Sequence, residues 1–234
     1  MLLAMDTSTS LIGAACVSGQ SLLSEATVAD GRRHGELLTP TIERAIAESG
    51  QQLSQVSQVV TGVGPGPFTG LRVGIVTAKV MARALGVPVT GVCSLDALAM
   101  QARDWLSQAG AAGSADILVA SDARRKEVYW ARYTIGTDGI QRHGEPAVGR
   151  AGELPEAVRR LPAVGRGPGL YPEALRALAA PGDVPSPNLL DVQPGTIGRL
   201  AGRPRYVRAP EPLYLRRPDA QPQPSMAGST PAST

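Results

Sequence analysis

Residues 6–10 read Asp-Thr-Ser-Thr-Ser and bring one carboxylate and four hydroxyls together directly after a short apolar run. Such a turn can contact nucleotide phosphates, with Asp6 near a metal ion. Asp, Ser and Thr also commonly hydrogen-bond to the amides of their own turn. We favour this second interpretation, and we keep Asp6, Thr7 and Ser8 as candidate nucleotide or phosphate contacts.

A second candidate is the stretch GVGPGPFTGLRVG at residues 62–74, which contains the only phenylalanine of the chain. Gly64 and Gly66 could offer backbone N–H groups to a phosphate at a helix N-terminus. The stretch lacks the GK[ST] ending of a P-loop. A structural interpretation is favoured, in which Thr69 caps a helix, the glycines allow positive φ, and Phe68 packs back onto that helix.

The remaining reactive residues are few. The two histidines, His34 and His143, form no HxxxH or HExxH pattern, and Cys16 and Cys93 lie in apolar runs without metal-like spacing. The sequence therefore predicts no metal site and no self-contained hydrolytic site. Arg124 and Arg125 lie at an expected hairpin tip, where they could reach a phosphate or remain a solvated turn.

Composition sets further limits. The chain has 234 residues, a formal net charge of +3 and only 3% aromatic residues, so we expect a core of small aliphatic side chains. No apolar run reaches 18 residues and no basic segment opens the chain. We expect a cytoplasmic protein with no membrane segment. A charge of +3 gives little phosphate neutralisation, which disfavours a free tRNA-binding protein.

Hydrophobic periodicity predicts an α/β protein of two lobes. Three strands fill the first thirty residues, a helix runs from 35 to about 50, a strand covers 56–63, and a helix covers 69–86. A strand and a helix over 95–108 complete a first lobe of residues 1–108. A smaller lobe, 109–217, opens with a hairpin of strands. It continues with a short helix near 153–161, a strand-like stretch near 162, and helices over 171–180 and 194–202. Residues 218–234 are expected to be a disordered tail.

The chain resembles the TsaB family, formerly YeaZ. The resemblance rests on LLAMDTST, HGELLTP, the long block from GVGPGPFTG to SLDALA, DARRKEVYWARY and PLYLRRPDA, in that order and over nearly the whole chain. It implies an actin-like (ASKHA) fold of two lobes, each a mixed sheet flanked by helices. It also implies a non-catalytic subunit in the formation of threonylcarbamoyladenosine beside the tRNA anticodon.

The same resemblance implies partners. A TsaD-type paralogue carries the metal and the transferase chemistry, a TsaE-type ATPase joins the complex, and tRNA is met through the complex. Alone, the protein is expected to form a homodimer. No tightly bound cofactor is expected, although ATP or ADP at the partner interface stays open. Where the paralogue has a pair of metal-binding histidines, this chain has Ser94 and Leu98, and neither can replace an imidazole ligand.

The expected partner surface lies on the first two long helices. The second of these has apolar residues on two faces, so it should be buried on both sides. The predicted interface consists of Leu37, Leu38, Thr41, Ile42, Ala45, Phe68, Leu71, Val73, Val76 and Val80.

Two alternatives stay open, an independent actin-like ATPase or kinase that uses Asp6, and a metal-dependent peptidase. The chain departs from the usual family pattern at Val63, Pro67 and Lys126. Pro67 removes an N–H that a phosphate could use, which weakens the nucleotide interpretation of the glycine-rich loop. Lys126 puts a tight hairpin in doubt.

Overall fold

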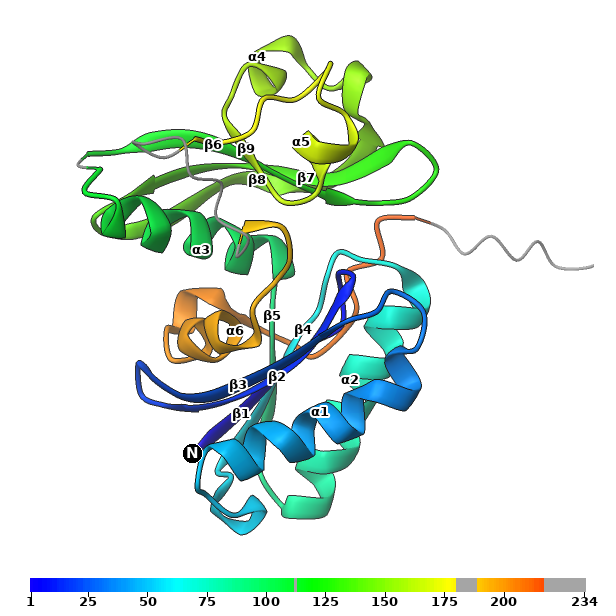
Figure 1. Cartoon of the computed structure of the whole chain (residues 1–234), viewed down its shortest axis with the longest axis vertical. Coiled ribbons are helices and arrows are strands. Elements are labelled where there is room, and N and C mark those ends of the chain that lie inside the picture. Colours follow the sequence, from blue (N-terminus) through cyan, green and yellow to red (C-terminus); the bar gives the residue numbers. More distant parts are fainter. Residues whose placement is uncertain (112, 180–188, 217–234) are drawn as a thin grey trace, which may run out of the picture.

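The computed structural model describes residues 1–111, 113–179 and 189–216 (Figure 1). It has two lobes, each built on one sheet with helices packed against it. The expected tail, 218–234, lies outside the described residues. Within the described ranges, no helix has both the length and the apolar composition needed to cross a membrane.

The first lobe contains a six-stranded mixed sheet in the order β10-β5-β4-β1-β2-β3. β1 pairs antiparallel with β2 and parallel with β4, so the first turn and the end of β4 meet at one edge of the sheet. The three expected N-terminal strands are confirmed. The strands of this sheet are β1 (Leu2–Asp6), β2 (Leu11–Ser18), β3 (Ser21–Ala29), β4 (Gln58–Gly62), β5 (Val89–Val92) and β10 (Val207–Arg208).

Two long helices, α1 (His34–Glu48) and α2 (Phe68–Leu85), cover one face of this sheet, and α6 (Pro194–Ala201) covers the other (Figure 1). α1 buries Leu38, Ile42 and Ala45 at helical spacing, which is why it lies flat on the strands. α2 ends at Gly86, whose φ of 68° is a left-handed conformation that favours glycine.

The second lobe contains a four-stranded sheet in the order β8-β7-β6-β9. Counted along the chain within each lobe, the third, second, first and fourth strands are neighbours in both sheets: β3-β2-β1-β4 in the first and β8-β7-β6-β9 in the second. This repeated order, in which the first and fourth strands of each lobe pair in parallel, is the actin-like arrangement that was expected. The elements are β6 (Ala115–Asp122), β7 (Glu127–Gly136), β8 (Gly139–Arg150), β9 (Ala163–Val164), α4 (Glu156–Arg159) and α5 (Gly167–Leu170).

The chain passes between the lobes several times. α3 (Ser94–Gln108) lies beneath the second sheet and buries residues against it, although it falls within the expected first segment, 1–108. α6 and β10 return to the first sheet, although they fall within 109–217. A boundary at residue 108 therefore divides the sequence into two segments, each of which contributes an element to the other lobe.

Two local expectations need correction. The helix expected over 171–180 is absent from the described part of that segment, because Ala163 N–H donates to the Arg176 carbonyl and Leu178 N–H donates to the Ala163 carbonyl. These bonds hold residues 176–178 extended beside β9. The 12-residue strand β8 is not among the strands that the sequence pattern predicts.

Candidate functional site

The carboxylate of Asp6 is fully buried and is engaged by neighbouring groups of the protein. Oδ1 accepts hydrogen bonds from the Ser8 amide at 2.8 Å and the Ser8 hydroxyl at 2.7 Å. Oδ2 accepts one from the Ser94 hydroxyl at 2.9 Å, and that hydroxyl accepts the Gly64 N–H at 3.1 Å. Burial raises the pKa of Asp6 to about 6. Both oxygens of this carboxylate thus accept hydrogen bonds from groups of the same chain.

Four glycines spaced four residues apart pack against this turn. A Cβ added at Gly62 would overlap the Asp6 carboxylate, and one added at Gly66 would overlap the Ser8 carbonyl. Gly70 and Gly74 likewise leave no room for a Cβ beside Thr7. Close approach of backbone to backbone is a common reason for glycine. The glycine-rich loop therefore fills the space next to the first turn.

Thr7 fastens the first turn directly to α2. Its hydroxyl donates to the Gly70 carbonyl at 2.7 Å and accepts the Gly74 N–H at 3.1 Å. A regular helix would pair those two backbone groups with each other, since they are four residues apart. The side chain of Thr7, which is only 2% exposed, therefore holds α2 against the first turn.

The start of α2 differs from expectation. The helix begins at Phe68 with Pro67 as N-cap, and no side chain caps it, so the expected cap by Thr69 is wrong. The ring of Phe68 does not fold back onto the helix alone. It stacks on Tyr214 with centroids 5.0 Å apart, and the Arg72 guanidinium lies over it at 5.0 Å. Phe68 is 43% exposed, so this aromatic pair is also a surface feature.

The C-terminal segment around Tyr214 connects the two lobes, and no pattern in the sequence indicates this role. Leu213 N–H donates to the Val63 carbonyl at 2.8 Å in the first lobe. Arg216 donates to the Ala123 carbonyl at 2.9 Å and pairs with Glu127 in the second lobe. This segment therefore fixes the β6–β7 hairpin relative to the start of α2.

The crevice between the lobes is nearly closed. It encloses a cavity of about 20 Å³ lined by Ser8, Pro67 and Arg124 among others, whereas small-molecule sites span about 300–1,000 Å³. Arg166 pairs with Asp191 through two bonds of 2.8 and 2.5 Å at its wall. A nucleotide does not fit in this crevice as it stands.

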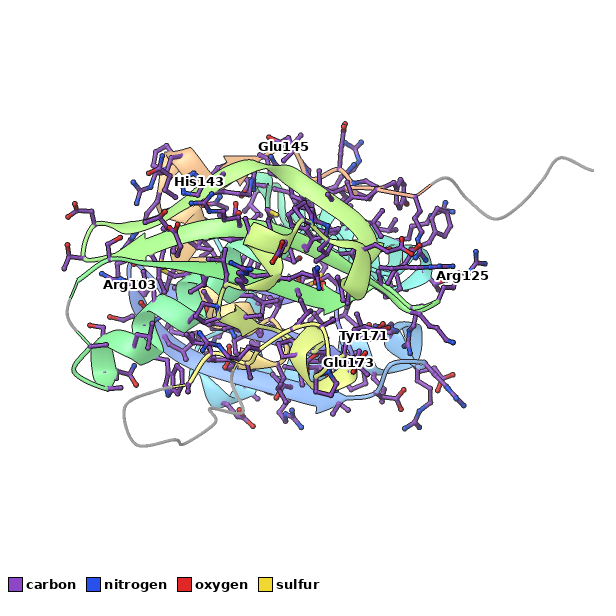
Figure 2. The ribbon with its side chains drawn as sticks, turned by 90° about the horizontal axis from the view of Figure 1, so that it is seen from above. Arg103, Arg125, His143, Glu145, Tyr171 and Glu173 are labelled. Carbon is purple, nitrogen blue, oxygen red and sulfur yellow. The ribbon has the colours of Figure 1, made fainter. Side chains whose placement is uncertain are left out.

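The two hairpin arginines lie at one end of the second lobe. Arg124, which lines the crevice, contacts Asp122 at 3.6 Å, and Figure 2 shows Arg125 at the edge of the molecule, far from Arg103. Arg124, Arg125 and Lys126 all adopt positive φ of 54–63°. The hairpin is tight despite Lys126, because Ala123 N–H donates to the Glu127 carbonyl at 3.0 Å.

Neither histidine nor cysteine forms a reactive cluster within the residues the structure describes, where no group of three potential metal-ligating side chains occurs. His34 is buried beside the Thr9 carbonyl, and His143 contacts Thr134 on β7. Burial raises the pKa of Cys93 to about 12, so this thiol stays protonated. Leu98, at the second expected histidine position, is fully buried in the core.

Burial narrows the predicted partner surface. Five of the ten residues face the protein's own core and are at most 3% exposed, so no partner can reach them in this fold. They are Leu38, Thr41, Ile42, Ala45 and Leu71. Leu37 and Val73 are half-buried, whereas Phe68, Val76 and Val80 are 43%, 53% and 62% exposed. One side of α2 is therefore buried against its own lobe and the other is exposed, so the expected burial of this second side stays a prediction.

Fold and site together define an actin-like protein whose first turn packs against the protein's own glycines and is hydrogen-bonded by its own hydroxyls. Residues 22–157 match the family described as "TsaD: tRNA N6-adenosine threonylcarbamoyltransferase". An uncharacterized protein of Mycobacterium tuberculosis is 40% identical over 229 residues, covering 94% of this chain and 93% of the relative.

A second relative carries a descriptive name. The tRNA threonylcarbamoyladenosine biosynthesis protein TsaB of Escherichia coli is 32% identical over 195 residues, covering 79% of this chain and 81% of the relative. The structure of YeaZ from Pseudomonas aeruginosa matches with a TM-score of 0.69 and 28% identity, covering 92% of this chain and 99% of that one. The chain belongs to the TsaB (YeaZ) family.

Proposed function

We propose that the protein is a non-catalytic subunit in threonylcarbamoyladenosine formation on tRNA, which binds and activates a TsaD-type transferase. The observation that carries this proposal is the occupied first turn. Both oxygens of Asp6 are hydrogen-bonded within the chain, and the glycine-rich loop packs directly against them. The name of the Escherichia coli relative, a tRNA threonylcarbamoyladenosine biosynthesis protein, supports the pathway.

The exposed side of α2 supports binding as the remaining activity. Val76 and Val80 are among the most exposed large apolar residues described, and they lie one helical turn apart. Exposed apolar residues that cluster on a surface often mark a protein interface. We propose this surface as the contact with the transferase, and with a second copy when the chain is alone. A TsaE-type ATPase, tRNA met through the complex, ATP or ADP at the interface and a cytoplasmic location complete the proposal.

Reconstitution tests this function. The purified chain is mixed with the TsaD-type paralogue of its own organism, and complex formation is measured by size-exclusion chromatography with light scattering. Transfer of the threonylcarbamoyl group to tRNA is then assayed with the full set of pathway proteins. We expect a complex and a transfer rate that depends on both proteins.

A matched pair of variants locates the contact. Val76→Glu should abolish the complex, whereas Leu170→Glu, at a similarly exposed position of the second lobe (49%), should not. Both should keep the circular dichroism of the parent chain. The proposal fails if no complex forms under any nucleotide condition, or if the chain alone hydrolyses ATP at a rate that Asp6→Ala removes.

A further inference from the structure

A cavity of about 170 Å³ lies between α3 and α6, on the other face of the first sheet from α1 and α2 (Figure 1). It is several times larger than the ~30 Å³ that one water molecule takes up in the liquid. Its wall includes three guanidinium groups. We call it the arginine pocket, and Met100, Arg103, Asp104, Arg199, Leu200 and Arg203 are among the residues that line it.

The charges of the arginine pocket do not balance. Asp104 provides its one carboxylate, which is shared between Arg103 at 2.9 Å and Arg199 at 3.2 Å. The Arg203 guanidinium is half-buried and forms neither an ion pair nor a hydrogen bond within the part of the chain that the structure describes. Three cations therefore face one anion, which leaves two positive charges uncompensated in a partly buried place where salt screens them weakly.

The turn between β7 and β8 holds the arginines around the pocket. Arg103 donates to two carbonyls of this turn, at 3.2 and 2.8 Å, and Arg205 donates to the Asp138 carbonyl at 3.0 Å. A Cβ added at Gly139 would lie 2.6 Å from Nη2 of Arg205 and 3.7 Å from Nη1 of Arg203. The turn thus passes close to both guanidinium groups, but Arg203 alone keeps its donors available at the pocket wall.

We infer that the arginine pocket binds the phosphate group of a small ligand such as a nucleotide. The planar fork of a guanidinium matches phosphate oxygens in pairs. A phosphate monoester carries about 1.5 to 2 negative charges at pH 7, which compensates the surplus of the pocket, whereas a carboxylate would compensate half of it. The inference is independent of the proposed function, because it concerns a small ligand and the opposite face of the sheet.

An adjoining cavity offers room for the rest of such a ligand. This second cavity, of about 220 Å³, shares Asp104 and Arg199 with the arginine pocket and is also lined by Trp105, Gln108 and Gln193. Together the two cavities reach the range of small-molecule sites, about 300–1,000 Å³. Aromatic and amide side chains are typical contacts of a nucleobase. Three cations in a concave site suit one small phosphate ligand better than RNA, of which they would neutralise few phosphates.

This site is distinct from the crevice beside Asp6. Among the residues that the structure describes, none that lines the crevice also lines either of these two cavities. Loss of binding in a variant of the arginine pocket therefore reports on the pocket itself and not on the first turn.

Isothermal titration calorimetry of the full chain with AMP, adenosine and inorganic pyrophosphate tests this inference. Arg203→Gln removes a cation without breaking a bond of the folded chain. Arg150→Gln is the matched control, because it removes the same charge from an exposed ion pair with Glu153 on the second lobe. Asp104→Asn removes the competing carboxylate. Circular dichroism and thermal unfolding establish that each variant is folded.

We expect AMP and pyrophosphate to bind, and adenosine to bind at least about 10-fold more weakly than AMP, because it lacks the phosphate. Arg203→Gln should weaken AMP binding roughly 10-fold or more, through the loss of a hydrogen bond to a charged group. The control should change it by less than about 2-fold. Asp104→Asn should tighten AMP binding, since Arg103 and Arg199 are then released from their shared partner.

Two results would overturn the inference. One is the absence of AMP and pyrophosphate binding by the parent chain up to about 10 mM. The other is an equal loss in Arg203→Gln and Arg150→Gln, which would indicate an unspecific charge effect. Filter binding of tRNA gives the last comparison. If Arg203→Gln loses affinity for tRNA while the parent chain ignores AMP and pyrophosphate, the pocket contacts an RNA backbone and the assignment to a small ligand is wrong.

Discussion

The contact between Gly62 and Asp6 predicts an unusually large effect for the addition of one methyl group. In Gly62→Ala, the new Cβ would coincide with the Asp6 carboxylate and lie 2.9 Å from the Ser94 hydroxyl, so the carboxylate must move. Overpacking a core costs about 1–3 kcal/mol. Losing a hydrogen bond to a charged group costs about 1.5–3 kcal/mol. We therefore expect the free energy of unfolding to fall by about 3–5 kcal/mol.

Urea denaturation followed by circular dichroism at 222 nm measures this change, provided that the slope against urea stays constant. Gly35→Ala is the matched control, because Gly35 lies exposed in α1 with nothing within 4 Å of an added Cβ. It should raise stability by about 0.5–1 kcal/mol through helix propensity. A loss below about 1 kcal/mol in Gly62→Ala would show that the first turn yields easily, which would refute the close-packing argument.

Three further predictions follow from the same structure. Burial raises the pKa of Asp6 from 3.8 to about 6, so the folded chain holds this proton more tightly than the unfolded chain does and its stability falls as the pH rises. Relative to Asp6→Asn, the parent chain should lose up to about 3 kcal/mol of stability when the pH is raised from about 4 to 6, measured by urea denaturation across that range. Leu38→Glu should abolish folding, seen by circular dichroism, because Leu38 is 1% exposed, whereas Val76→Glu should leave unfolding unchanged within about 0.5 kcal/mol. A double-mutant cycle of Phe68→Ala and Tyr214→Ala should give a coupling energy of about 1 kcal/mol by thermal unfolding, and additivity would show that the stacked rings contribute nothing.

Much of the fold follows from local pattern. α1 and α2 have apolar residues at helical spacing, and Gly86 followed by Pro88 marks the end of α2. The sequence of β8, GIQRHGEPAVGR, shows little alternation of apolar and polar residues, and only Gly139, Ile140 and Pro146 are buried in it. The pattern therefore does not predict this strand. The 171–180 segment has helical composition, but its pairing with Ala163 is a long-range effect that overrides propensity.

The site was predictable only in part. The clustering of a carboxylate and hydroxyls in the sequence indicates Asp6, Thr7 and Ser8 as candidates, and the hydrogen bonds expected within this turn are present. Ser94 lies 88 residues from Asp6, so no local pattern could reveal their hydrogen bond. The stacking of Tyr214 on Phe68 likewise depends on how the C-terminal segment returns to the first lobe.

The position of Gly70 and Gly74 on one side of α2, four residues apart, has an evolutionary consequence. The inner side of the helix is positioned by contacts of its backbone with the first turn, through Gly70, Gly74 and the hydroxyl of Thr7. The outer side makes no contribution to that attachment. Substitutions on the outer side can therefore accumulate without changing the angle at which the helix is presented, so recognition can diverge between related organisms while the scaffold stays constant.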